Sequence, residues 1–235
     1  MALGLSNRLS KTGLTTPGIV TSNLVLKHNY TAGNVVPVSD GAAYFDNSND
    51  YIAITEQTYS VHDTAHSFTF WSNRNALDNY SIVLGHTVSG SYSFIMLDQD
   101  GNRMILEGDN ADNSEGTIDA LVAGVWNHFA IVATGSSGAV KMYQNGVEVS
   151  VSGTTDSDVL INRIGIGATS TNPYDGYLCN IGIWAGRALT QAEVKSVMNK
   201  NYAGLTSSEK TSLQSWWNLS ADANDSHGSN NGTLS

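Results

Sequence analysis

The sequence of 235 residues contains a single cysteine, Cys179, and only three prolines. One cysteine excludes an intrachain disulfide and a cluster of thiolate metal ligands. Because Cys179 lies in an apolar strand pattern, we expect it to be a buried, unreactive thiol. The low proline content argues against disorder, so we expect a folded domain.

Charged residues are also scarce: they make up 14% of the chain, against about 25% in an average soluble protein. The 21 acidic residues outnumber the 11 basic ones, which gives a formal net charge of −10 at pH 7. Such a chain is repelled by phosphate backbones and by anionic lipid surfaces. We therefore expect neither nucleic acid nor a membrane among its partners.

Long apolar runs are missing as well. No stretch is long enough for a membrane-spanning helix, and the first ten residues contain no signal-peptide core. We therefore expect the protein to be made in a cytoplasm, without a signal for secretion.

The sequence is instead rich in small and polar residues, including 23 glycines, and 40% of it is hydrophobic. This composition is typical of turns and half-exposed strands around one core. Asn145-Gly146 suits a two-residue hairpin turn, because both residues tolerate a positive φ. Strand patterns cover residues 23–27, 42–45, 51–54, 67–71, 81–84, 92–97, 125–134, 139–143, 147–149, 162–167, 176–184 and 213–219. Many short strands with one late helix predict an all-β, antiparallel sandwich.

The one clear helix signal lies near residues 190–199. Thr190 can cap a helix, and Glu193 stands at the third helical position, which completes a capping box. Leu189 and Val194 occupy the two positions of a hydrophobic staple. We therefore predict a helix of about two to three turns there.

Residues 1–18 lack strand periodicity and end in a Thr-Pro-Gly turn. We predict that they form an N-terminal arm, followed by one sandwich domain over residues 19–235 that includes the C-terminal strand segment 213–235. The arm carries four leucines and two basic residues but no acidic residue. This composition favours docking onto an acidic neighbour, and an ordinary frayed terminus is the alternative.

Four segments resemble motifs of laminin-G-like jelly rolls. Residues 41–52 resemble the G-x-A-x-x-F-D…D-Y-V entry of such a domain, and residues 124–130 resemble its W-x-H-V-A strand. Residues 142–147 are similar to a Y-V-N-G hairpin, and residues 174–194 are similar to a strand followed by R-A-L-S-x-x-E. The four motifs occur in the family's order, which makes the set more specific than any one of them.

This resemblance implies the two packed antiparallel sheets, or jelly roll, of the concanavalin A-like lectin and glucanase superfamily. The closing segment 216–233 is similar to the segment that usually opens such a domain. Either the strand order is permuted, which we prefer, or the family's first strand is supplied at the end. With few charges and the opening segment 24–28, the chain is also similar to proteins of marine bacteriophage particles.

Enzymatic chemistry is not predicted. A glucanase of this superfamily places two carboxylates on one strand, in an E-x-D-x-E pattern, so that alternate side chains face one cleft. The glutamates here are isolated from that spacing, and no G-x-S-x-G motif is present. These glutamates are Glu56, Glu107, Glu115, Glu148, Glu193 and Glu209.

Asp46 and Asp50 are the candidate metal ligands. With Ser48 they alternate in one short polar loop, which offers the hard oxygen atoms that calcium prefers. An Asx-rich turn that satisfies its own backbone is the alternative. His62 and His66 are four residues apart, but they lead into a strand, so we do not expect a metal pair. No cofactor other than calcium is expected.

Exposed aromatic rings would suit a glycan, because such rings stack on the faces of sugars. From strand alternation we expect Trp126 and Trp184 in the core. Of the neighbours Trp216 and Trp217, one must point outward if both lie on a strand. The outward ring either contacts a ligand or is covered by the N-terminal arm.

These observations and the resemblance together predict a non-catalytic structural or recognition module. The first hypothesis is a virion surface protein, a capsid decoration or fibre-associated module that is assembled in the host cytoplasm. Its partners would be other virion proteins or copies of itself, with a cell-surface glycan as a further ligand. A free carbohydrate-binding lectin module is the alternative, and a glucanase is the third hypothesis.

Overall fold

The structure is a computed structural model in which residues 35–76, 80–87, 93–98, 101–167 and 172–235 are described. The chain divides into residues 1–33 and residues 34–235, and the following account concerns the second unit alone. The predicted N-terminal arm, the start of the domain at residue 19 and the strand pattern at 23–27 lie outside the described residues. Within them, no helix is long and apolar enough to cross a membrane.

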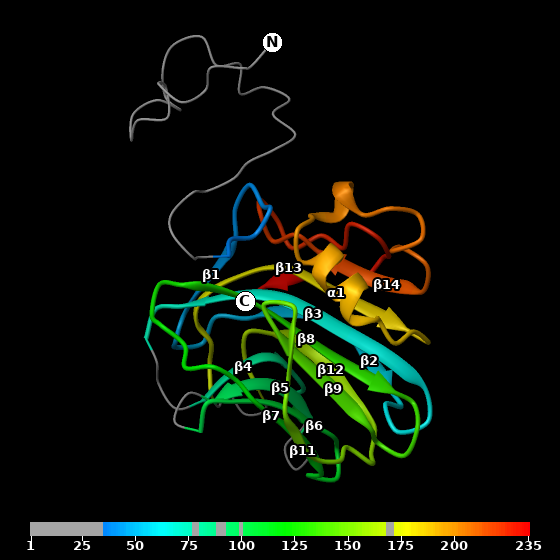
Figure 1. Cartoon of the computed structure of the whole chain (residues 1–235). Coiled ribbons are helices and arrows are strands. Elements are labelled where there is room, and N and C mark those ends of the chain that lie inside the picture. The colour runs from blue at the N-terminus through cyan, green and yellow to red at the C-terminus, as the bar shows by residue number, and fades with distance from the viewer. Residues whose placement is uncertain (1–34, 77–79, 88–92, 99–100, 168–171) are drawn as a thin grey trace, which may run out of the picture. The chain divides into compact units, whose positions relative to one another are not determined.

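Two antiparallel sheets face each other, as the sequence predicts, and the sandwich is therefore confirmed (Figure 1). Over the described residues, sheet A has the order β1-β13-β3-β8-β9-β10, with β14 also paired to β13, and sheet B has the order β11-β7-β6-β5-β4-β12-β2-β15. Sheet A comprises β1 (Ala43–Asp46), β3 (Ala65–Arg74), β8 (Trp126–Thr134), β9 (Val140–Gln144), β10 (Val147–Val149), β13 (Asp175–Ala185) and β14 (Leu213–Trp217). Sheet B comprises β2 (Ile52–Tyr59), β4 (Tyr80–Gly85), β5 (Phe94–Asp98), β6 (Arg103–Glu107), β7 (Asn113–Thr117), β11 (Val151–Gly153), β12 (Val159–Ile164) and β15 (Thr233–Leu234).

The core lies between the sheets and follows the two-residue period of the strands. In β3, Phe68 and Phe70 belong to the large core cluster, whereas Trp71 belongs to a separate cluster on the outer face of sheet A. The predicted hairpin is also present: Gln144 of β9 pairs with Val147 of β10. Asn145 and Gly146 between them have φ values of 51° and 76°, as a two-residue turn with two positive φ angles requires.

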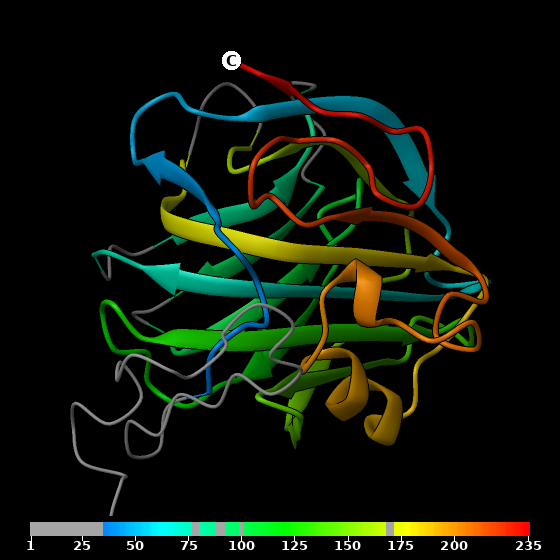
Figure 2. The same ribbon diagram turned by 90° about the horizontal axis from the view of Figure 1, so that it is seen from above.

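β13 lies second in the order of sheet A, and one of its edges is shared by two strands. Its first half pairs with β1 and its second half with β14, while β3 occupies the other edge (Figure 2). The change occurs at Asn180, a buried residue with a φ of 48°. Asparagine tolerates this left-handed conformation better than most residues. The extra residue lets Leu178 and Ile181, three positions apart, both face the core.

A small layer covers the outer face of sheet A beside β14 (Figure 1). It contains α1 (Gln191–Val197) and the 3₁₀ helix η3 (Tyr202–Gly204). The predicted capping box is present, since Thr190 accepts from the Glu193 N–H and Glu193 accepts from the Thr190 N–H. Both members of the predicted staple, Leu189 and Val194, are buried in one cluster. The helix ends at Val197, slightly before the predicted end.

Trp216 and Trp217 point to opposite faces of sheet A, as alternation predicts, and both are buried. Trp217 lies in the core between the sheets, whereas Trp216 packs against Trp184 in the outer layer, with ring centroids 6.1 Å apart. A Cβ atom on Gly182 would come within 2.6 Å of the Trp216 ring, so only glycine permits this approach. The outer layer therefore covers Trp216.

Cys179 is buried, as predicted, in a small cluster with Trp71 and Met198. Burial raises the pKa of its thiol to about 12, although a hydrogen bond with Ser39 opposes this effect. At neutral pH the group is therefore a thiol and not the nucleophilic thiolate.

The outer layer is held by the carboxylate of Glu209, which is 5% exposed. Lys200 Nζ donates to both carboxylate oxygens at 2.6 and 2.7 Å, and Ser196 Oγ of α1 donates at 2.7 Å. The Thr206 N–H donates at 2.8 Å. Burial alone would raise the pKa of Glu209, but these hydrogen bonds outweigh it and lower the pKa to about 2.

We predict that Glu209→Gln lowers the free energy of unfolding by about 2 to 3 kcal/mol, because it leaves Lys200 without its partner. Since the folded-state pKa of Glu209 is lowered, the ionised pair stabilises the protein fully above about pH 4.5 and loses its effect as the pH falls toward 2. Urea unfolding at pH 7 and pH 3 measures both effects, and the difference between variant and parent should shrink at pH 3.

Glu148→Gln is the matched control, because Glu148 pairs with Lys141 at 3.5 Å on an exposed surface. Such pairs contribute at most about 1 kcal/mol. If both variants lose the same free energy of unfolding at pH 7, the buried ion pair of Glu209 contributes no more than the exposed pair.

Candidate functional site

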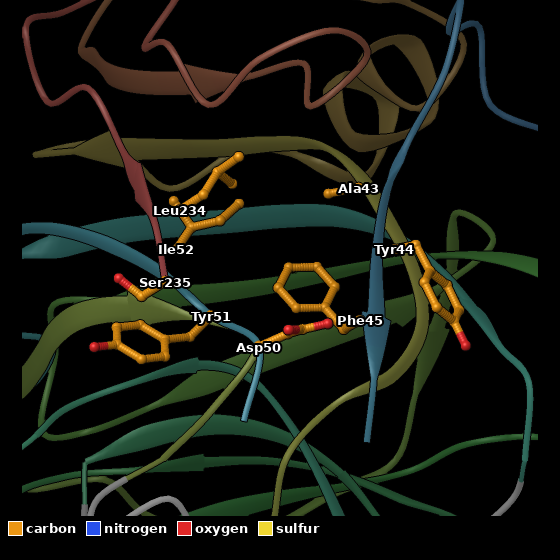
Figure 3. A pocket seen from close by; sticks show the side chains of 8 residues that line it. All are labelled: Ala43, Tyr44, Phe45, Asp50, Tyr51, Ile52, Leu234 and Ser235. Atoms are coloured by element: carbon orange, nitrogen blue, oxygen red, sulfur yellow. The ribbon is translucent and has the colours of Figure 1, made fainter. Parts of the chain in front are cut away.

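A groove opens where the end strands of the two sheets face each other. β1 ends sheet A and β15 ends sheet B, so each has one edge without a partner strand among the described residues. The first pocket in this groove has a volume of about 220 Å³ (Figure 3). Phe45, Ile52 and Leu234 give it an apolar interior, while Asp50 and Ser235 supply polar atoms at its rim.

A second pocket adjoins the first and has a volume of about 250 Å³. The two pockets share Ala43, Tyr44, Ile52 and Leu234, and the second extends along residues 219–223. Each is smaller than a typical enclosed small-molecule site of about 300–1,000 Å³. Together they form one open, shallow depression, which we call the edge groove. Such a shape suits an extended ligand that lies along the surface.

Tyr44 joins the edge groove to the outer face of sheet A. Tyr44 lines both pockets, but its ring turns away from Phe45 and Leu234 toward the other side of β1 (Figure 3). There it meets Tyr177, its register partner on β13, with ring centroids 5.0 Å apart. The two side chains are 51% and 39% exposed. They form an accessible aromatic pair, which we call the tyrosine pair.

The tyrosine pair continues into a row across sheet A. Tyr177 is in register with Asn73 of β3, and Asn73 is in register with Trp126 of β8. The Asn73 side-chain amide donates to the Gly124 carbonyl at 3.1 Å, which fixes its orientation. Trp126 is half-buried, so the prediction that it belongs to the core is wrong. It begins β8 at the end of the sandwich, where only part of its ring packs against Trp71.

Carboxylates surround these aromatic rings. Asp46 and Asp175 stand directly opposite each other on β1 and β13. Each is two residues from a tyrosine of the pair on its own strand, so the carboxylates and the rings lie on the same face. Asp50 and Asp222 line the edge groove. Among the described residues, no lysine or arginine forms an ion pair with any of these four carboxylates. A cation does lie beside the first pocket: the Arg163 guanidinium is 4.4 Å from the centroid of the Tyr51 ring, which lines that pocket.

Asp46 has other contacts in the structure than the predicted calcium ligands. Asp46 accepts the Ser48 N–H at 3.0 Å, which is the Asx turn named as the alternative. Its cross-strand neighbour is Asp175, whose carboxylate accepts from Asn75 at 3.1 Å. Over the described ranges, no group of three or more His, Cys, Asp or Glu side chains is placed to hold a metal ion.

A second charged cluster lies on the outer face of sheet B. Arg103 donates to the buried Asp98 and to Glu115, the latter at 2.8 Å. Burial raises the pKa of the nearby Glu107; a hydrogen bond with Asn113 opposes this effect, and the charges of Asp112 and Glu115 add to it. A carboxyl group with a raised pKa beside a second carboxylate is the arrangement of a general acid in glycosidases. Arg103, however, holds both Asp98 and Glu115 as ion-paired groups.

Residues 46–195 match the family model of the concanavalin A-like lectin/glucanases superfamily, which is well over half of the chain. The chain therefore belongs to this superfamily, and the laminin-G-like resemblance is confirmed. Among curated protein sequences, none is significantly similar to it.

Solved structures share the fold at low sequence identity. A proposed carbohydrate-binding protein from Bacteroides ovatus has a TM-score of 0.55 and 17% identity, over 82% of this chain. This chain spans 57% of the length of that protein. Domain 4 of an extracellular arabinanase from Geobacillus stearothermophilus, in complex with arabinotriose, has a TM-score of 0.50 and 21% identity, over 67% of this chain and 76% of its own.

Calcium binding through Asp46 and Asp50 stays a prediction, and thermal unfolding tests it. An ion that binds only the folded state stabilises it by about 2.7 kcal/mol at one hundred times its Kd. The expected result is a higher Tm in millimolar calcium than in chelator, with the difference abolished by Asp46→Asn. Equal melting temperatures in calcium and chelator would contradict it.

Proposed function

We propose that this chain is a non-catalytic carbohydrate-binding module that holds a saccharide against the tyrosine pair and along the edge groove. The observation that carries the proposal is the exposed pair Tyr44 and Tyr177 beside an open groove. Aromatic rings offer a flat apolar face with a polar edge, and hydroxyl and carboxylate groups nearby can bond to sugar hydroxyls. Two proteins of similar fold support the proposal: the proposed carbohydrate-binding protein from Bacteroides ovatus and the arabinanase domain in complex with arabinotriose.

The shape of the site also favours a saccharide chain over an enclosed small molecule. The edge groove is shallow, and it runs from the apolar gap at Phe45 and Ile52 to residues 219–223. The Tyr44 ring lies on the other side of β1 from that gap (Figure 3), where it contacts the Tyr177 ring. An extended ligand crossing β1 contacts both surfaces, and Tyr44 is the residue common to them.

We predict that Tyr44→Ala and Tyr177→Ala each weaken glycan binding by roughly 5- to 20-fold, because each removes an aromatic contact worth about 1 kcal/mol or more. A glycan array identifies a ligand, and titration calorimetry then measures the affinity of each variant. Folding should persist, since both rings are partly exposed.

Tyr80→Ala is the control for these variants. Tyr80 is 44% exposed, like the tyrosine pair, but it lies on β4 in the other sheet. Its removal should leave the affinity unchanged. If all three variants bind like the parent protein, the ligand does not occupy this site.

We predict no turnover of β-glucans such as laminarin or lichenan. In the charged cluster on the outer face of sheet B, Arg103 donates hydrogen bonds to both Asp98 and Glu115, so neither carboxylate is free to act on a substrate. Reducing-sugar release should stay at the level of buffer in both the parent chain and Glu107→Gln. Release by the parent that disappears in Glu107→Gln would show that the module is an enzyme.

We also propose that the module is carried on a virion, as a capsid decoration or a fibre-associated protein. Other virion proteins or copies of itself would be its partners there. The support for this narrower proposal is the resemblance of the sequence to proteins of marine bacteriophage particles, and co-purification with particles tests it.

A further inference from the structure

Among the described residues, none of the four carboxylates around the edge groove forms an ion pair with a lysine or an arginine. Asp46 and Asp175 are register partners, and like charges directly opposite each other destabilise a sheet. Their recorded partners are neutral: the Ser48 N–H and the Asn75 amide. Asp222 accepts from the backbone and side chain of Asn224, which are neutral as well. A positively charged ligand would relieve the repulsion between these carboxylates, so the site is suited to such a ligand.

The tyrosine pair lies on the same outer face as Asp46 and Asp175. The register places Tyr44 opposite Tyr177 and Asp46 opposite Asp175, and residues two apart on a strand share a face. An ammonium group above a tyrosine ring is attracted by the ring's negative face. Two carboxylates beside such a pair of rings add charge-assisted hydrogen bonds to the same group.

Building on the proposed carbohydrate-binding function, we propose that this site selects saccharides that carry free amino groups, such as oligomers of a deacetylated hexosamine. The protonated amine lies over Tyr44 and Tyr177, between the rings and the Asp46–Asp175 pair. Asp222 extends the negative charge along the second pocket of the edge groove, away from Arg163 and Tyr51. The same negative charge rejects saccharides that carry carboxylates, including uronic acids and sialic acids.

Other ligand classes fit less well. A second copy of this chain would bring its own acidic β1 edge against this one, and the net charge of −10 opposes that contact. A neutral saccharide can stack on the tyrosine pair, but it leaves the four carboxylates without a counter-charge. The amino sugar is therefore the saccharide class that uses both features of the surface.

The experiment compares three tetramers by titration calorimetry at pH 6, where the amine is protonated, with the full chain in chelator to remove divalent cations. The probes are a glucosamine tetramer, the N-acetylglucosamine tetramer of the same backbone and a galacturonate tetramer. We expect the glucosamine tetramer to bind roughly fivefold tighter than the acetylated one, as exposed carboxylates allow, and the galacturonate tetramer not to bind measurably. Raising the salt to 1 M should remove most of the preference, because salt screens exposed charges.

The double variant Asp46→Asn and Asp175→Asn tests the residues directly, and the preference for the amine should fall to about one. The matched control is Asp63→Asn with Glu148→Gln, which also removes two exposed charges. Asp63 lies before β3, at the end of sheet A opposite the tyrosine pair, and Glu148 lies on β10. The control should keep the full preference, which separates this site from general attraction to an acidic protein.

Two kinds of result would overturn the inference. One leaves the proposed carbohydrate-binding function intact, and the other removes it. If the acetylated tetramer binds through Tyr44 with the same affinity as the amine, or if galacturonate binds equally well, selection by charge is wrong while carbohydrate binding stands. If none of the tetramers binds and the glycan array is also blank, the proposed function fails, and this inference fails with it.

Discussion

The arrangement of sheet A depends on how β13 buries both faces and both edges at once. A strict two-residue alternation would turn Ile181 away from the core that Leu178 faces, but the extra residue at Asn180 restores the phase. The same residue marks the point where β1 gives way to β14 along one edge. Its side-chain amide donates to the Val38 carbonyl at 3.0 Å, and its N–H donates to the Asn218 carbonyl. Because β14 takes the second half of that edge, β1 is short, and the edge groove opens beside it.

Much of the fold was predictable because its signals are local. The turn at Asn145 and Gly146 and the cap at Thr190 depend on residues within a few positions of one another. Placements between distant segments were not predictable, since a two-residue period says which residues share a face but not which strand lies alongside. The cover over Trp216 is an example: alternation required an outward ring, but only the structure shows that residues near α1 bury it.

The candidate site was predictable only in fragments for the same reason. Asp46 was recognised as a ligand candidate, but sequence proximity linked it to Asp50, whereas the register of β1 on β13 places it opposite Asp175. Tyr44 and Tyr177 each occur in motifs that identify the family, and nothing local indicates that they meet. Alternation around buried Phe45 and Leu178 does place both tyrosines on an outer face, so this signal was available once those neighbours were assigned to the core.

The carboxylates also bear on how an open sheet edge is protected from pairing with another strand. An edge strand offers unpaired N–H and C=O groups to any other strand, and proteins protect such edges with charge and with short length. β1 has four residues and ends in Asp46, while β15 has two. When two copies approach edge to edge, the negative charges at this edge repel each other. A positively charged ligand that does not pair as a β-strand is not repelled in this way. Charges that oppose the pairing of another strand at this edge are thus compatible with the proposed cationic saccharide.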